Sequence, residues 1–280
     1  MNWLDATLPA PAENLAFDEA LLDAAESSDA GECLRFWESK VHFVVVGYAN
    51  KVATETNPAV CEGLGIPILR RCSGGGTVLQ GPGVLNYTLI LRIAEDGPLA
   101  NITSANRFIM QRNADALTQL LSTERGCPSR SASASQPSRA GKPTASATIS
   151  PAAAETVALR VEVQGHTDLA IGGLKFSGNA QRRKRHHLLF HGAILLNLDL
   201  DLLEQVLPMP TLRPEYRDNR SHREFLMQFN APAKLIKEAL RQAWSAKEPL
   251  DLASRWPGWR ASVERLVAER YSHHDWNFRI

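Results

Sequence analysis

The chain has 280 residues, enough for one large domain or two small ones with a sizeable hydrophobic core. Apolar residues make up 44% of the sequence and charged residues 22%, which excludes a fully disordered protein. The 31 Lys and Arg residues balance 30 acidic residues, and a formal net charge of +1 argues against nucleic acid or an anionic membrane as the partner. The sequence has neither a secretory signal nor roughly 18 consecutive apolar residues, so we expect a cytoplasmic protein.

The cysteines are few and scattered along the chain. No two of the four have CxxC spacing, so neither a disulfide framework nor a zinc site is indicated. They stand at Cys33, Cys61, Cys72 and Cys127.

Hydrophobic periodicity predicts helices and strands in the first 125 residues. A helix is expected over 14–26, with Asn14 as its N-cap, and a second helix over 102–122. Strands are expected where β-branched or alternating apolar residues form short runs. These runs lie at 41–48, 66–71 and 85–93.

Residues 126–155 differ in composition from the rest of the chain. Of these 30 residues, 23 are Ala, Ser, Pro, Gly or Thr, and none is aromatic. Such a segment has too little apolar surface to offset the entropy that is lost on ordering. We interpret it as flexible, either an insertion in a surface loop or a linker between domains.

After this segment the pattern changes to short strands and then to helices. Strict alternation predicts a strand over 157–164, and apolar runs separated by glycines predict three more between residues 168 and 198. Helices are expected at 235–244 and 259–271. Because helices and strands occur in unequal blocks without a regular βαβ repeat, the sequence predicts an α+β fold with a mainly antiparallel or mixed sheet flanked by helices.

The first candidate site follows the predicted strand at 66–71. Three consecutive glycines let the backbone approach a ligand closely, and free amides in such a loop can hold phosphate oxygens. Two adjacent arginines would add charged donors for phosphate or carboxylate. The competing interpretation is a tight hairpin with solvated arginines, since the motif is neither a Walker loop nor a dinucleotide fingerprint. The motif reads Arg70-Arg71-Cys72-Ser73-Gly74-Gly75-Gly76-Thr77.

The second candidate site surrounds a lysine in the strand-rich part after residue 155. Lys175 lies between two apolar residues and precedes a Ser-Gly pair, so a strand could carry its ammonium group into a cleft. There it could neutralise charge at a reacting carbonyl or phosphate. The competing interpretation is a surface lysine and a core histidine. The residues of this candidate site are Asp168, Lys175, Ser177, Gly178 and His191.

Together these motifs resemble the lipoate–protein ligase family, within the superfamily of biotin and lipoate ligases and octanoyltransferases. The glycine motif of that family reads RRxSGGG, which residues 70–76 match. Tyr271 and Trp276 resemble the aromatic pair that ends the family's catalytic domain. The lysine motif reads roughly DL…K[IVF]SGxAxxR…HG, and its matches are Asp168, Lys175 to Ala180, Arg182, and His191-Gly192.

The resemblance implies a domain organisation. Because the family places both motifs in one site, residues 1–280 are expected to form a single biotin/lipoate ligase-like catalytic domain, with 126–155 as a flexible insertion in a surface loop. No C-terminal accessory domain is expected. A separate small accessory protein could therefore take part, as it does for some members of the family.

The resemblance also implies the chemistry. ATP, with Mg²⁺, and lipoate or octanoate condense to an acyl-adenylate, and Lys175 is the implied catalytic residue beside the reacting carbonyl. A lysine of an acceptor then takes the acyl group. The implied acceptors are the lipoyl domains of 2-oxoacid dehydrogenase acyltransferase subunits or the glycine cleavage H protein. No metal ligand from the protein is implied, and the residues implied to bind substrate or nucleotide are Arg70, Arg71, Ser73, Gly74, Gly75, Gly76, Thr77, Asn86, Asp168, Ser177, Gly178, Ala180 and His191.

Two other functions remain open, and one enzyme class is disfavoured. Many ligases have His-Asp where this chain has Gln80-Gly81, and its Gly81-Pro82-Gly83 resembles the octanoyltransferase branch, which transfers the acyl group from a carrier protein without ATP. That route proceeds through a cysteine thioester, yet no cysteine follows Cys127, so the ligase is favoured. A non-catalytic homologue is the alternative from another class. Biotin ligation is disfavoured because a GRGRxGR-like loop is absent.

Overall fold

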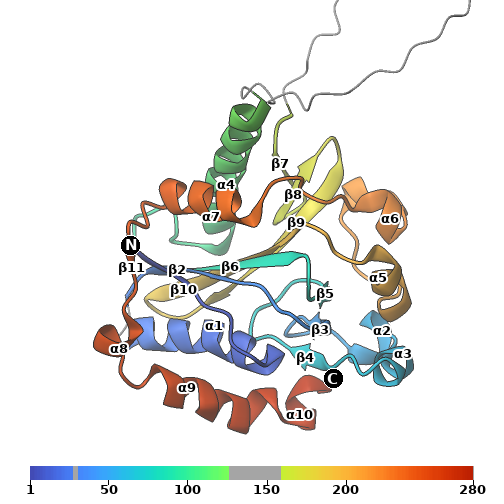
Figure 1. Ribbon diagram of the computed structural model, residues 1–280, viewed down its shortest axis with the longest axis horizontal. Helices are drawn as coiled ribbons and strands as arrows, with labels where there is room; N and C mark the ends of the chain where they lie inside the picture. Colours follow the sequence, from blue (N-terminus) through green and yellow to red (C-terminus); the bar gives the residue numbers. More distant parts are fainter. Residues whose placement is uncertain (28–30, 126–158, 280) are drawn as a thin grey trace, which may run out of the picture.

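The computed structural model describes residues 1–27, 31–125 and 159–279. The segment 126–155, expected to be an insertion, lies outside these residues. Figure 1 shows a layered arrangement in which a central sheet has helices on both faces. No helix in the described part of the chain is long and apolar enough to cross a membrane.

The main sheet has eight strands and mixes parallel with antiparallel pairing. In spatial order the strands are β11 (Glu248–Pro249), β1 (Asn2–Asp5), β2 (Cys33–Trp37), β6 (Val84–Arg92), β10 (His187–Leu195), β9 (Leu174–Arg183), β8 (Asp168–Ile171) and β7 (Glu162–Gln164). Strand β1 is parallel to both β11 and β2, whereas the other pairs of this sheet are antiparallel. The predicted α+β class with a mainly antiparallel or mixed sheet is therefore confirmed.

A second sheet positions the glycine motif. Its three strands are β4 (Ile68–Arg70), β3 (Phe43–Val46) and β5 (Val78–Gln80), with β3 in the middle. Because β4 and β5 are the two edges, the loop 71–77 leaves one edge and returns at the other, across the end of β3. Gly47 follows β3, and a Cβ there would lie 2.1 Å from the carbonyl oxygen of Gly75. The close crossing of the two loops therefore requires glycine at residue 47.

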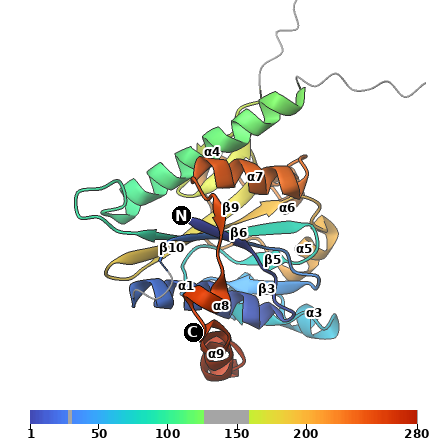
Figure 2. The same cartoon turned by 60° about the vertical axis from the view of Figure 1, so that its left-hand side comes forward.

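Helices cover both faces of the main sheet. Helices α1 (Pro11–Glu26) and α9 (Trp259–Leu266) pack together on one face, and α4 (Ile102–Arg125) and α7 (Ala233–Ala243) pack together on the other (Figure 1 and Figure 2). The shorter helical elements are α2 (Val52–Glu55), α3 (Pro58–Gly63), α5 (Leu200–Val206), η1 (Glu215–Arg217), α6 (His222–Phe225), α8 (Leu252–Arg255), η2 (Val267–Tyr271) and α10 (His274–Asn277).

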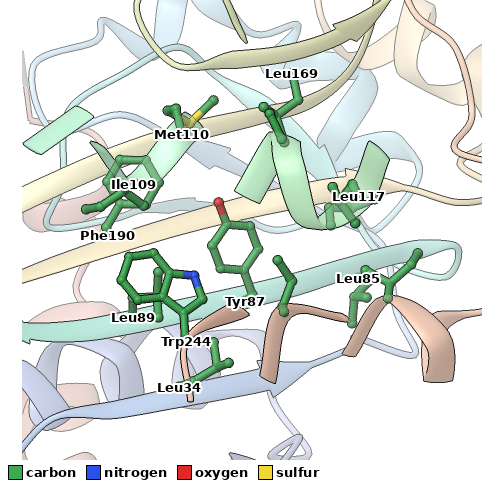
Figure 3. Packing of buried hydrophobic residues seen from close by; sticks show 14 of the residues in the cluster. Leu34, Leu85, Tyr87, Leu89, Ile109, Met110, Leu117, Leu169, Phe190 and Trp244 are labelled. Carbon is green, nitrogen blue, oxygen red and sulfur yellow. The ribbon is translucent and has the colours of Figure 1, made fainter. Parts of the chain in front are cut away.

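The core beneath α4 contains a chain of buried polar side chains. Trp244 Nε1 donates to Asn113 Oδ1 at 2.7 Å, and Asn113 Nδ2 donates to the hydroxyl oxygen of Tyr87 at 2.8 Å. The Tyr87 hydroxyl donates to Asn179 Oδ1 at 2.5 Å. Figure 3 shows Tyr87 and Trp244 among the apolar side chains of this cluster. Because buried polar groups cost free energy unless they are paired, this chain holds Asn179, within the lysine motif, in one place.

The structure corrects two of the predicted element boundaries. Helix α1 begins at Pro11, since proline in the first helical position is already in helical geometry. Asn14 is therefore a buried helical residue, and its Oδ1 accepts hydrogen bonds from the N–H of Leu8 at 2.9 Å and from Arg35 Nη2 at 2.7 Å. The prediction of Asn14 as an N-cap is wrong. A strand was predicted over 157–164. Among its residues that the structure describes, only those of β7 (Glu162–Gln164) form a strand.

The other predicted elements are present with shifted ends. The strands predicted at 41–48, 66–71 and 85–93 are β3, β4 and β6. The three strands predicted between 168 and 198 are β8, β9 and β10, and the later helices are α4, α7, and α9 continued by η2.

Candidate functional site

One cavity of about 790 Å³ brings the two sequence motifs together. Its lining comes from the loop after β4, from β9 and β10, and from segments around α5 and α6. Of the residues predicted from the sequence, those that line it are Arg71, Gly75, Gly76, Thr77, Asn86, Asp168, Lys175, Gly178, Ala180 and His191. The predicted residues outside the lining are Arg70, Ser73, Gly74 and Ser177.

The glycine loop has backbone amides without an internal acceptor. Arg71 donates from Nη2 to the carbonyl oxygens of Gly74 at 2.6 Å and Gly76 at 2.7 Å. Because N–H and C=O point in opposite directions across a trans peptide, the amides of Gly75 and Thr77 point away from Arg71. Within the described ranges, no group accepts a hydrogen bond from these two amides. Free amides in such a loop are suited to bind an anion.

Gly75 needs to be glycine for two reasons. Its φ of +85° lies in the left-handed region, which side chains disfavour. A Cβ there would also lie 2.9 Å from Arg71 Nη2 and 3.3 Å from the Cβ of Ala180. The loop therefore packs directly on β9, next to the lysine motif.

Arg70 has a different environment from the one expected. Its side chain is fully buried, and burial would be costly without hydrogen-bond partners. The guanidinium donates to five carbonyl oxygens, which belong to Gly47, Tyr48, Asn50, Trp276 and Arg279. Arg70 therefore joins the loop after β3 to the segment around α10, and the cavity lining does not include it, although it was expected to bind a substrate anion. Periodicity could not distinguish the two neighbouring arginines, because only the tertiary structure decides which one is enclosed.

Arg71 lies at the boundary between the protein interior and the cavity. Burial lowers the pKa of Arg71 to about 10, so the guanidinium remains charged near neutral pH. It lines the cavity while it holds the carbonyls of the loop. Its positive charge thus lies behind the free amides and favours an anion there.

Lys175 forms an ion pair on the other side of the cavity. Its Nζ lies 2.8 Å from Asp168 Oδ1, and the two side chains are 25% and 13% exposed. Asp168 pairs with Gly178 across β8 and β9. A Cβ on Gly178 would lie 3.0 Å from Lys175 Nζ, so the missing side chain provides the room for the ammonium group.

Tyr216 completes this group and was missed by the sequence reasoning. Its hydroxyl donates to Asp168 Oδ2 at 2.9 Å. Burial and the neighbouring Asp168 carboxylate raise the pKa of Tyr216, so the hydroxyl stays protonated. Nothing in the local sequence indicates this contact, because η1 begins 40 residues after Lys175 and carries no motif of its own.

His191 connects the glycine loop to the sheet. Its Nε2 lies 2.6 Å from Ser73 Oγ, and its Nδ1 lies 3.6 Å from Asp18 Oδ2. Asp18 Oδ1 forms an ion pair with Arg35 Nη1 at 2.6 Å. Asp18 was also missed, although a charged residue among the apolar residues of a predicted helix was an available signal. His191 therefore fits both interpretations from the sequence: it is hydrogen-bonded within the core, and it also lines the cavity.

Two amide side chains form a closed pair in the cavity wall. Gln80 Nε2 donates to Asn86 Oδ1 at 2.8 Å, and Asn86 Nδ2 donates to Gln80 Oε1 at 2.9 Å. Both residues are buried and line the cavity. The pair accounts for Gln80, which stands where many ligases resembling this chain have histidine.

The cysteines that the structure describes are unsuited to nucleophilic chemistry. Cys33, Cys61 and Cys72 are buried, and none lines the cavity. Burial raises the pKa of Cys33 to about 12, and it raises the pKa of Cys61 and of Cys72 as well. Cys127 lies outside the described residues. Across residues 1–27, 31–125 and 159–279, no three His, Cys, Asp or Glu side chains gather as a metal site.

Comparisons with known proteins agree with the resemblance seen in the motifs. The family model of the lipoyl protein ligase A/B catalytic domain matches residues 10–125 and 143–247. An octanoyltransferase LipM from Brevibacillus brevis is 28% identical over 279 residues, covering 96% of this chain and 95% of that protein. A second one, from Moorella thermoacetica, is 31% identical over 208 residues, covering 74% and 69%.

Solved structures share the fold. A bipartite lipoate protein ligase from Thermoplasma acidophilum, studied with its E2 lipoyl domain, has a TM-score of 0.72 at 22% identity, covering 99% of this chain and 95% of that chain. A lipoate-protein ligase A bound with ATP has a TM-score of 0.71 at 21% identity, covering 99% and 98%. The chain belongs to the lipoyl protein ligase A/B catalytic domain family.

Proposed function

We propose that the protein is an ATP-dependent lipoate–protein ligase, which activates lipoate or octanoate as an acyl-adenylate and transfers the acyl group to a lysine of a lipoyl domain. One observation carries the proposal. The cavity combines a loop of free amides with a lysine and, among its described lining, contains no thiol. This combination suits the approach of two anions and does not suit a cysteine thioester.

The first step joins two negatively charged substrates. A carboxylate oxygen of the fatty acid forms a bond to the α-phosphorus of ATP, and the bond to pyrophosphate breaks with its electron pair on the leaving group. The amides of Gly75 and Thr77 and the charge of Arg71 would hold the anion. Lys175 would stabilise the charge that develops where the two substrates meet. Mg²⁺ would enter with the phosphates of the nucleotide.

The second step transfers the acyl group. The amine nitrogen of the acceptor lysine attacks the acyl carbon, AMP leaves with the bonding electron pair, and the amine loses one proton as the amide forms. Negative charge develops on the carbonyl oxygen, and Lys175 would face it from β9. Asp168 would hold the ammonium group in place before substrate binds, since it contacts Nζ at 2.8 Å.

The remaining lining suggests where the acyl chain and the other groups would lie. Leu15, Trp37 and Val45 give the cavity apolar walls, which suit a hydrocarbon chain. The residues proposed to contact substrate or nucleotide besides Lys175 are Arg71, Gly75, Gly76, Thr77, Asn86, Asp168, Gly178, Ala180 and His191.

The same proposal includes the acceptor protein, the domain organisation and the cellular location. The related ligase from Thermoplasma acidophilum was studied with an E2 lipoyl domain, which supports a lipoyl domain as the acceptor here. The glycine cleavage H protein and a separate accessory protein remain candidate partners. We treat residues 1–280 as one catalytic domain that acts in the cytoplasm, where ATP is supplied.

A second candidate function is octanoyl transfer from acyl carrier protein without ATP. It is favoured by the names of the curated relatives, such as the LipM proteins of Brevibacillus brevis and Moorella thermoacetica. This route needs a reactive thiolate. The three described cysteines are buried away from the cavity, so the route would have to use Cys127.

The experiment that decides between them measures pyrophosphate release and acyl transfer on one preparation. Wild type and Cys127→Ser are each given ATP with lipoate or octanoate, with and without a lipoyl domain. In a separate reaction each is given octanoyl-acyl carrier protein and a lipoyl domain without ATP. Lipoate-dependent pyrophosphate release and acceptor modification, both retained in Cys127→Ser, would establish the ligase. Octanoyl transfer from acyl carrier protein without ATP, lost in Cys127→Ser, would establish the transferase instead.

A further inference from the structure

We propose that Asp18 and His191 are positioning residues, which orient the glycine loop through a directional chain of hydrogen-bonding groups. The proposal rests on the proposed function only in assigning the anion site to that loop. This series of hydrogen-bonding groups begins at Asp18, which is buried and lines the cavity, passes through His191 and Ser73, and ends at Arg71. None of these side chains except Arg71 and His191 has a role in the proposed chemistry, and Asp18 lies on α1, far along the sequence from both motifs.

The series of hydrogen-bonding groups starts at the Asp18 carboxylate, which stays ionised. Burial alone would raise the pKa of Asp18, but the Arg35 guanidinium and His191 outweigh burial and lower it. Asp18 Oδ1 forms an ion pair with Arg35 Nη1 at 2.6 Å. Oδ2 is buried, has no hydrogen-bond partner among the residues the structure describes, and faces His191 Nδ1 at 3.6 Å. A negative oxygen there favours the imidazole tautomer with its proton on Nδ1.

That tautomer determines the direction of the next bond. With the proton on Nδ1, Nε2 is an acceptor, and the Ser73 hydroxyl at 2.6 Å donates to it. Ser73 Oγ in turn accepts from Arg71 Nε at 3.1 Å. Arg71 then holds the carbonyl oxygens of Gly74 and Gly76. Arg71 Nε is shared between Ser73 Oγ and the carbonyl oxygen of Gly74, so these hydrogen bonds link the tautomer of His191 to the direction in which the loop's amides point.

The sheet register explains why these residues meet. Arg35 on β2 pairs with Thr88 on β6, and Thr88 pairs with His191 on β10. Directly paired residues share a face of the sheet, so this row lies on the face that α1 covers. Ala180 on β9 pairs with His191 and continues the row to the glycine loop. A polar row thus crosses an otherwise apolar face and ends beneath the anion site.

The variant Asp18→Asn tests the direction of these hydrogen bonds. Its amide oxygen would still face Arg35, so its NH₂ group would face His191 Nδ1 and favour the opposite tautomer. Nε2 would then carry the proton, and the buried Ser73 hydroxyl would lose its acceptor. We expect [¹⁵N]histidine spectra to show the Nδ1–H tautomer of His191 in wild type and the Nε2–H tautomer in Asp18→Asn. The His191 signal is assigned by its absence in His191→Gln.

Activity provides a second measurement that a purely structural role would not reproduce. We expect kcat/KM for acyl transfer to fall on the order of tenfold in both Asp18→Asn and Ser73→Ala. Because both variants interrupt one chain, the double variant should be no slower than the slower single variant. Asp23→Asn is the matched control, since Asp23 lies on the same helix in a partly exposed ion pair with Lys184, and it should retain wild-type activity.

The outcomes separate this proposal from the proposed function. The tautomer is measured without substrate, so it does not depend on whether ATP is used. The Nε2–H tautomer in wild type, or multiplicative losses in the double variant, would overturn the positioning role even if pyrophosphate release is observed. Failure of Asp18→Asn to fold would leave the wild-type spectrum and Ser73→Ala as the deciding measurements.

Discussion

The two sides of the cavity are held in place by different means. On the glycine-loop side, Ser73 is fully buried, and the side chains of Asp18 and His191 are 3% and 14% exposed. On the lysine side, the side chains of Lys175 and Asp168 are 25% and 13% exposed. The first group is anchored from inside the sheet, whereas the second borders the solvent-accessible space.

This difference indicates how each side can respond to a ligand. Moving the glycine loop would break buried hydrogen bonds, and unpaired buried groups are costly. Moving Lys175 away from Asp168 costs less, because the pair borders the cavity and a charged group of a ligand can replace the carboxylate. We infer that the loop is a preformed anion site, and that Lys175 can exchange its carboxylate partner for a reacting group.

The largest effect is expected from Arg70→Met, which tests the buried side. Removing the guanidinium leaves several carbonyl oxygens without their donor, and we expect the free energy of unfolding to fall by about 3–5 kcal/mol. Urea denaturation measures the change. Arg182→Met, on an exposed residue of β9, is the control and should be nearly neutral. Unchanged stability in Arg70→Met would show that the buried contacts do not anchor the loop.

Lys175→Ala should reduce activity with little change in stability. Loss of one group that stabilises a developing oxyanion lowers kcat by about 10²–10³. The side chain is 25% exposed, so the protein should fold normally. Single-turnover acyl transfer measures the effect, with Lys234→Ala on α7 as an exposed control. Near-native turnover would mean that Lys175 does not act on the reacting atoms.

Gly75→Ala probes the preformed loop without changing any charge. The positive φ and the contact of the new Cβ with Arg71 Nη2 force the loop to move. We expect roughly tenfold weaker binding of ATP, measured by calorimetry, with the fold retained. Gly172→Ala, also at a positive φ but with open space around its Cβ, is the matched control for backbone strain. Equal effects of the two variants on ATP binding would exclude a specific role of the loop.

Tyr216→Phe should have a smaller effect, confined to the lysine side. The variant removes the hydrogen bond at 2.9 Å to Asp168 and keeps the ring. We expect kcat to change by about tenfold or less, because the ion pair of Lys175 remains. Steady-state kinetics measure it, and a change in stability without a change in kcat would indicate a purely structural contact.

The smallest effect is expected when the three described cysteines are treated with an alkylating reagent. Burial raises the pKa of the Cys33, Cys61 and Cys72 thiols, so they remain protonated at pH 8 and react slowly with iodoacetamide. Mass spectrometry of the folded protein measures their labelling, and activity should be unchanged after the reaction. Rapid labelling of Cys72 together with loss of activity would contradict the location of the thiols and favour a transferase.

Much of this architecture was predictable because it depends on local patterns. Alternation and periodicity predicted the main strands and the long helices, and most of the site residues predicted from the two motifs line the cavity. The start of α1 was mispredicted because Asn14 is a good cap by residue type, while Pro11 begins the helix and Arg35 binds the asparagine from strand β2. Contacts of that kind have no local signature.

The sequence by itself determined the fold class, the family resemblance and the two motifs, since apolar periodicity and motif spacing are written along the chain. Only the tertiary structure decided that Arg70 is enclosed while Arg71 borders the cavity, because burial depends on what packs from elsewhere, here the segment around α10. It likewise joined Asp18 to His191 and Tyr216 to Asp168. These pairs are distant in sequence, and strand register with helix packing alone brings their side chains within reach.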